Sequence, residues 1–91
     1  MRISGFEWED GNILHLALGH GIKPEEAEEV FAFAPLFGKT RRGQYVAFGR
    51  TRAGRLLVIV LEKKVQGLVR TITGWDMGVA ERRFYQRYRK G

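Results

Sequence analysis

His15 and His20, the only histidines of the chain, are the residues best suited to acid–base chemistry. An imidazole changes its charge near neutral pH, so either ring is able to hold or release a proton under physiological conditions. The two residues lie five positions apart in a segment that we expect to be helical, and five helical steps turn a side chain by about 140°. The rings are therefore predicted to diverge. Because zinc needs at least three converging protein ligands, we expect no metal site.

Each histidine also has a structural interpretation. His15 shares a helical face with Asn12, and we expect its ring to be partly buried and bonded to a backbone or carboxylate group. His20 precedes Gly21 at the expected end of the helix, where it either interacts with terminal carbonyl groups or acts as an acid or base. The structural role is the favoured one for His15, and both roles stay open for His20.

Most of the positive charge lies in the second half of the chain. Residues 38–91 have a net charge of +11 and residues 1–37 a net charge of −5, which together give the +6 of the whole chain. Such an asymmetry favours a polyanionic partner on one surface, and RNA is the natural candidate. The alternative interpretation is a solvated basic surface that keeps the protein soluble.

Arg70 is the best single candidate for phosphate binding, because it lies in the middle of a predicted strand among apolar neighbours. An arginine buried without a partner is very costly, so Arg70 must either bind an anion or pair with a carboxylate such as Glu81. Trp75 either stacks on a base, a contact worth about 1–3 kcal/mol, or anchors the last helix to the sheet. The residues predicted to bind RNA are Lys39, Arg41, Arg42, Arg52, Arg55, Trp75 and Arg82.

The composition is that of an ordinary globular domain, with 44% hydrophobic and 29% charged residues among 91. The absence of cysteine excludes disulfides and cysteine-based zinc sites. No apolar run approaches the roughly 18 residues of a membrane span, and the first ten residues lack the apolar segment of a secretory signal. We expect one cytoplasmic domain over residues 1–91 that does not associate with a membrane.

The hydrophobic pattern predicts an α+β fold, in which helices pack against an antiparallel sheet. The expected elements are a strand at 2–8, helices at 10–21 and 23–35, strands at 43–51, 54–62 and 67–75, and a helix at 76–90. Six consecutive apolar residues at 56–61 are typical of a central strand that is buried on both faces. Short turns at 53–54 and 66–67 indicate that the last three strands form a meander.

The last helix is expected to begin after an N-cap at Asp76. Its apolar stripe is predicted to contain Met77, Ala80, Phe84 and Tyr88, which recur at helical spacing. This stripe would face the sheet.

Segments 6–31, 45–60 and 69–85, taken in order, resemble the BrnT family of bacterial toxins. The most specific parts of the likeness are Phe6-Glu7-Trp8, His20-Gly21-Ile22, Glu25-Glu26-Ala27, Val30-Phe31, Gly49-Arg50, Arg70-x-Ile72-Thr73 and Glu81-Arg82-x-x-Tyr85. The likeness covers nearly the whole chain, and its strength lies in the order and spacing of these parts.

The resemblance implies a RelE-like fold and a toxin of a type II toxin–antitoxin system, a metal-independent ribonuclease that inhibits translation without a cofactor. Its implied partners are RNA and a BrnA-like antitoxin of the ribbon-helix-helix type, in a heterotetramer, with a homo-oligomer as the other possible assembly. The expected catalytic residues are His20, Arg50, Arg70, Glu81 and Tyr85. The arginines, assisted by Arg55, would bind phosphate, and His20 or Glu81 would be the acid or base.

Two positions depart from the family pattern. Gly19 stands where a lysine is common, and Trp75 stands where an arginine is common. Losing both cations favours a second hypothesis, a non-catalytic module derived from a toxin that binds nucleic acid or an antitoxin-like protein.

Overall fold

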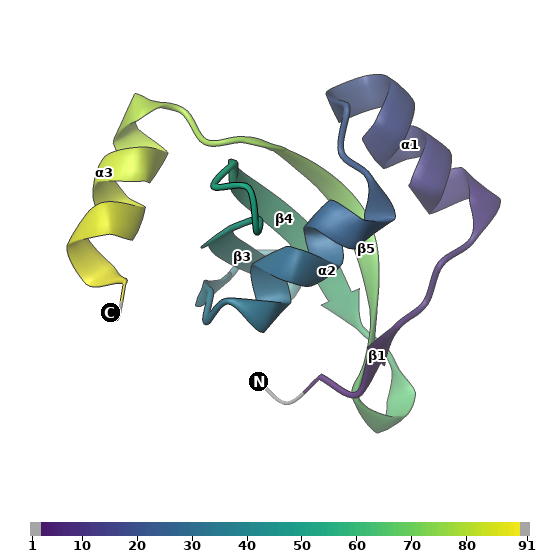
Figure 1. Ribbon diagram of the computed structural model, residues 1–91. Coiled ribbons are helices and arrows are strands. Elements are labelled where there is room, and N and C mark those ends of the chain that lie inside the picture. Colours follow the sequence, from purple (N-terminus) through teal and green to yellow (C-terminus); the bar gives the residue numbers. More distant parts are fainter. Residues whose placement is uncertain (1–2, 90–91) are drawn as a thin grey trace.

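A computed structural model describes residues 3–89 of the protein, apart from the side chain of Leu18. It contains one sheet and three α-helices (Figure 1). In chain order the elements are β1 (Gly5–Phe6), α1 (Asp10–His20), α2 (Pro24–Ala32), β2 (Leu36–Lys39), β3 (Tyr45–Arg50), β4 (Leu56–Lys63), a 3₁₀ turn (Val65–Gly67), β5 (Leu68–Asp76) and α3 (Val79–Tyr88). The predicted α+β class is confirmed.

The five strands form a mixed sheet in the order β1-β5-β4-β3-β2. Strands β2 to β5 pair antiparallel, each with its neighbour in the chain. β1 runs parallel to β5 and pairs with it through Gly5 to Leu68 and Phe6 to Val69. The expectation of a purely antiparallel sheet is therefore wrong. A parallel pair needs a long crossover, and the chain between β1 and β5 supplies it.

The sequence pattern does not predict β2, a four-residue strand at the edge of the sheet. β2 is short and contains a glycine and a lysine, so it carries little strand signal of its own. It forms because β3 offers a partner, with Lys39 opposite Tyr45. Lys39 thus ends an edge strand instead of lying in a loop, whereas Arg41 and Arg42 do lie in the turn that follows.

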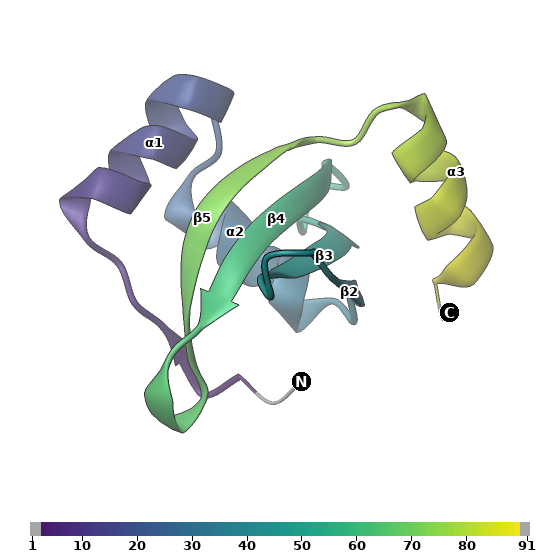
Figure 2. The same ribbon diagram turned by 180° about the vertical axis from the view of Figure 1, so that it is seen from behind.

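β4 is the central strand, as its apolar run predicts, and it packs on both faces of the sheet. Ile59 and Leu61 belong to the larger core, which also contains residues of α1 and α2. Val58 points the other way and packs with Met77 and Tyr85. We call the side of Ile59 the α2 face and the side of Val58 the α3 face. Seen from behind, β3 to β5 lie in front of α2, with α1 and α3 on opposite sides (Figure 2).

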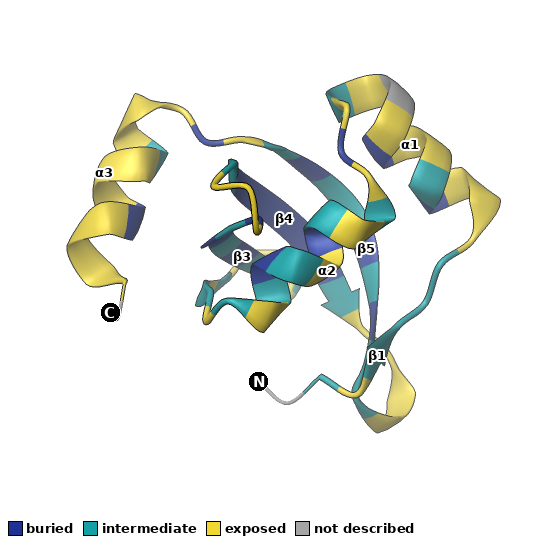
Figure 3. Cartoon of the chain, in the orientation of Figure 1, coloured by how far each residue is buried: buried dark blue, intermediate teal, exposed yellow. Residues whose placement is uncertain are grey.

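α3 packs on the sheet through Tyr85, of which only 3% is exposed. Most of the helix surface is exposed to solvent (Figure 3). The predicted apolar stripe is wrong for Ala80 and Tyr88, which are both exposed. Phe84 is 43% exposed, but its ring packs against Phe48 of β3, with 5.1 Å between the centroids. Met77 is buried, but it precedes the helix. It packs in the same cluster as Tyr85, the residue of α3 that faces the sheet.

The start of α3 also differs from the prediction. Asp76 stays in β5, opposite Leu57, and Gly78 is the N-cap. The side chain of Glu81 accepts a hydrogen bond from the backbone N–H of Gly78, at 2.9 Å. A carboxylate three residues into the helix thus satisfies a backbone donor that would otherwise have no partner. No helix within residues 3–89 is long and apolar enough to cross a bilayer.

We predict opposite effects when the same methyl group is added at two glycines. At Gly74 a Cβ atom would lie 2.9 Å from both the Val58 carbonyl oxygen and Ile59 Cδ1, whereas at Gly19 nothing lies within 4 Å. Gly74→Ala should therefore lower the free energy of unfolding by about 1–3 kcal/mol through overpacking. The matched control Gly19→Ala should raise it, by up to about 1 kcal/mol, because alanine favours a helix. Urea unfolding measures both, and equal effects would contradict the packing of β5 on β4.

Candidate functional site

His15 and His20 meet at Thr73, so the prediction that their rings diverge is wrong. The Nε2 atom of His15 lies 3.0 Å from Thr73 Oγ1, and the Nε2 atom of His20 lies 3.2 Å from the same oxygen. The ring centroids are 5.5 Å apart, with an angle of 63° between the planes. His20 is the last residue of α1, and both imidazoles reach the same hydroxyl of β5.

The outer edge of β5 positions these two rings. β1 covers β5 only at Leu68 and Val69, and α1 packs against the strand beyond them. Asn12, of which 6% is exposed, fixes the start of the helix. Its Oδ1 accepts from the Glu9 N–H at 2.8 Å, and its Nδ2 donates to the Glu7 carbonyl and to Thr71 Oγ1. The helix is thereby held along the strand.

A β-bulge decides which face carries the threonine of this site. Val60 pairs with Thr73 and Leu61 with Thr71, so Ile72 is the extra residue on β5. The buried Gly74 points to Ile59 on the α2 face. Thr73 and its second neighbour Trp75 therefore point to the α3 face, where Trp75 packs near Val58.

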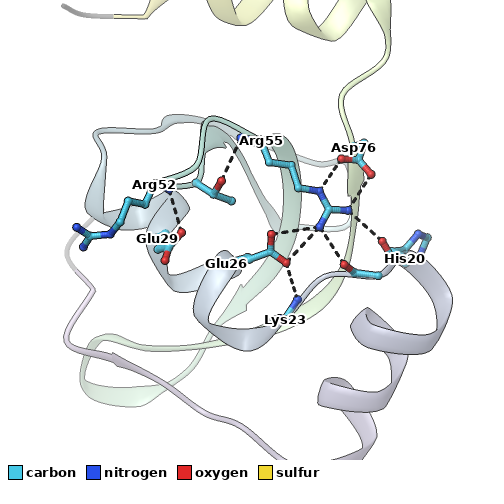
Figure 4. Close-up of polar contacts among 9 residues, drawn as sticks. His20, Lys23, Glu26, Glu29, Arg52, Arg55 and Asp76 are labelled. Carbon is cyan, nitrogen blue, oxygen red and sulfur yellow. Dashed lines mark hydrogen bonds and ion pairs between the residues drawn. The ribbon is translucent and has the colours of Figure 1, made fainter.

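Arg55 holds the adjacent end of α1 (Figure 4). Its Nε and Nη2 atoms donate to the two carboxylate oxygens of Asp76 at 2.8 and 2.9 Å. Nη1 donates to the Gly21 carbonyl at 2.9 Å and to Glu26, and Nη2 donates to the His20 carbonyl at 3.3 Å. The guanidinium thus joins the β3–β4 turn to α1, α2 and the end of β5.

This network changes the acidity of its members. The hydrogen bonds from Arg55 hold the pKa of Asp76 below its ordinary value. In return, the bond to Asp76, followed by the bond to Glu26, raises the pKa of Arg55. Arg55, predicted to bind RNA, has its donors engaged inside the protein and is a structural residue in this conformation.

Arg70, predicted to bind phosphate, forms ion pairs with two carboxylates. Its Nη1 atom lies 3.2 Å from Glu7 Oε1 and 3.0 Å from Glu9 Oε1. The hydrogen bonds to Glu7 and then to Glu9 raise the pKa of Arg70. The partner is therefore not Glu81, the carboxylate that the sequence suggests. A phosphate group would have to displace these two glutamates.

Glu81, Trp75 and Tyr85 lie together on the α3 face but are engaged with one another or with the core. The indole Nε1 atom of Trp75 donates to both carboxylate oxygens of Glu81 at 3.1 and 3.2 Å. Tyr85 is buried beside Val58 and Met77. Of the predicted catalytic residues, the structure thus brings Glu81 and Tyr85 to the face on which the His20 imidazole meets Thr73.

Two of the other predicted cations, Arg50 and Lys39, lie near aromatic rings. The guanidinium of Arg50 lies over the ring of Phe33, 4.3 Å from its centroid. Lys39 lies 5.5 Å from the ring centroid of Tyr45. The side chains of Lys39, Arg41, Arg42, Arg50, Arg52 and Arg82 have no carboxylate within 4.0 Å among residues 3–89.

Thr73 is not among the site residues that the sequence predicts, and for His15 the sequence favours a structural role. No local spacing links Thr73 to residues 58 and 53 positions earlier, and its hydroxyl is one of two in the strand, with Thr71 as the other. Two imidazoles joined through one hydroxyl can move protons between a bound substrate and the protein. In the part of the chain that the structure describes, no three His, Cys, Asp or Glu side chains cluster as metal ligands would.

No protein-family model matches the chain, and a search of curated proteins finds no match.

We predict that the Arg55–Asp76 pair makes stability depend on acid pH. Asp76 has a folded pKa below its ordinary 3.8, so its contribution is present above about pH 4 and is lost as pH falls through the folded pKa. Asp76→Asn should therefore lower the unfolding free energy at about pH 7 and have less effect at about pH 2.5. Urea unfolding at both values measures this difference. The control Glu25→Gln, at an exposed position, should show no comparable change, and an Asp76→Asn effect that is constant with pH would contradict the assignment.

Proposed function

We propose that the protein is a BrnT-like toxin with a RelE-like fold, a ribonuclease that cleaves RNA without a metal ion and so inhibits translation. The observation that carries this proposal is the large number of cations without a carboxylate partner. In the described residues only Arg55, Lys64 and Arg70 form ion pairs among the basic side chains. The other basic residues of the second half remain available to a polyanion.

These unpaired cations occupy several exposed elements. Arg41 and Arg42 lie in the β2–β3 turn, Arg52 lies in the β3–β4 turn, and Arg82 and Arg83 lie on α3. Glu7, Glu9 and Glu81 do not pair with them, because the first two bind Arg70 and the third binds the indole of Trp75. A surface of this kind binds the phosphate backbone with little dependence on base sequence.

RNA cleavage does not require a metal, because the 2′-hydroxyl of the substrate is itself the nucleophile. The protein must supply a base, an acid and positive charge for the phosphorane. His20 fits the first or second of these roles, and the exposed arginines fit the third. Trp75 lies on the same face as Thr73, and its ring would stack on a base if Glu81 released the indole.

A second candidate function is a non-catalytic, toxin-derived module that binds nucleic acid or an antitoxin-like protein. The ion pairs of Arg70 with Glu7 and Glu9 favour it, because the strongest phosphate-binding candidate is neutralised inside the protein. The exposed apolar and basic surface of α3 would suit a BrnA-like ribbon-helix-helix partner. This candidate predicts binding without turnover.

We predict that the purified protein cleaves RNA equally well with and without EDTA, and that its affinity for RNA falls steeply with salt. Replacing Arg41 and Arg42 with glutamine should remove up to two phosphate contacts, which lowers the slope of log affinity against log salt by about 1.4. Filter binding of RNA over a range of salt concentrations measures the slope.

The matched control is Lys64→Gln, because Lys64 is already paired with Glu62 at 3.1 Å. It should leave the slope almost unchanged. RNA binding without cleavage, together with normal growth of cells that express the protein, would reject the toxin and leave the binding module. An absence of both binding and cleavage would reject both candidates.

A further inference from the structure

The hydroxyl of Thr73 constrains the protons on the two histidines. A hydroxyl has one proton to donate and two lone pairs that accept. Both His15 Nε2 and His20 Nε2 lie within hydrogen-bond distance of Thr73 Oγ1, at 3.0 and 3.2 Å. The single proton can go to only one ring, so at least one ring must donate its own Nε2–H to the oxygen.

When the hydroxyl donates a hydrogen bond to one ring and accepts one from the other, the two neutral rings adopt opposite tautomers. The ring that receives the threonine proton has a bare Nε2 atom, and in its neutral form it carries its proton on Nδ1. The ring that donates through Nε2–H has a bare Nδ1 atom. One imidazole then presents a proton at Nδ1 and the other presents a lone pair there, which are the states required of an acid and a base.

We propose that His15 and His20 are this acid and base, that Thr73 is the residue that positions them, and that their substrate is an RNA phosphodiester. The inference rests on the function proposed above and adds His15 and Thr73 to its site. His15 is exposed and His20 half-buried. The ring hydrogen bonds of both in the described structure run through Nε2. The Nδ1 atoms are therefore left to contact the substrate.

The chemical step conserves protons and needs no other reactant. The bare Nδ1 of one ring takes the 2′-hydroxyl proton as the 2′-oxygen attacks phosphorus, and the other ring gives its Nδ1 proton to the 5′-oxygen as the P–O5′ bond breaks. The products are a 2′,3′-cyclic phosphate and a 5′-hydroxyl. In the same step the first ring passes its Nε2 proton to Thr73, whose own proton moves to the Nε2 of the second ring, so that the second ring never lacks a proton. The two tautomers are exchanged, and both rings stay neutral.

Three charged groups form one network at the backbone of His20. β5 contributes Asp76, the β3–β4 turn contributes Arg55, and α2 contributes Glu26. Arg55 binds the backbone carbonyl of His20 and the carboxylates of Asp76 and Glu26, so its charge is offset where it meets α1.

Nitrogen-15 NMR of the histidine rings in the free protein at alkaline pH tests the arrangement. We expect one ring with its proton on Nε2 and the other with its proton on Nδ1. Thr73→Ser should preserve this pattern, and Thr73→Val, which keeps the shape but removes the hydroxyl, should abolish it. The same tautomer in both rings of the unmodified protein would overturn the inference without touching the proposed function.

Cleavage assays test the chemistry with a matched set of variants. His15→Gln and His20→Gln should each lower the cleavage rate by about 10²- to 10⁴-fold. Leu14→Ala, at an exposed neighbouring position on α1, should leave the rate unchanged. Thermal unfolding shows whether each variant is folded.

If the protein cleaves RNA and the double histidine variant cleaves it equally well, only this inference fails. If the unmodified protein cleaves no RNA, the proposed function fails, and the inference with it.

Discussion

The guanidinium group of Arg55 is the contact on which the arrangement of this molecule depends. It binds the last carbonyls of α1, the Glu26 side chain of α2 and the Asp76 carboxylate at the end of β5. Carbonyl groups at the end of a helix lack partners within the helix, and a planar arginine fork can satisfy them and a carboxylate together. A lysine in this position could not hold the four segments in the same geometry, because it is a point charge.

The position of α1 follows from this contact and from Asn12 at the opposite end of the helix. Between these anchors α1 lies against the part of β5 that β1 leaves uncovered, and its two histidines reach Thr73. The bulge at Ile72 then determines that Thr73 shares a face with Trp75 and Glu81. Residues from both ends of the chain therefore border one surface, although no local motif joins them.

The internal ion pairs also shape the outer charge of the protein. Glu7 and Glu9 are used by Arg70, and Glu26 and Asp76 are used by Arg55. Each of these clusters joins one arginine to two carboxylates, while the arginines of the turns and of α3 form no ion pair among residues 3–89. A modest net charge of +6 thus becomes a surface with a strongly basic part. Such a surface speeds the encounter with a polyanion, whether or not chemistry follows.

The sequence by itself determined the elements with strong periodicity: the buried run of β4, the turns at Gly54 and Gly67, and helix α2 with its Pro24 start. These follow from local chemistry, because apolar runs, glycines and N-terminal prolines limit the backbone wherever they occur. The sequence did not reveal β2, the parallel pairing of β1, the inward side of α3, or the meeting of His15 and His20. Each of these depends on a partner far away in the chain, such as β3 for β2, Val58 for Tyr85, and Thr73 for the histidines. Only the tertiary structure brings those partners together, and helical spacing alone assigned the two rings to different directions.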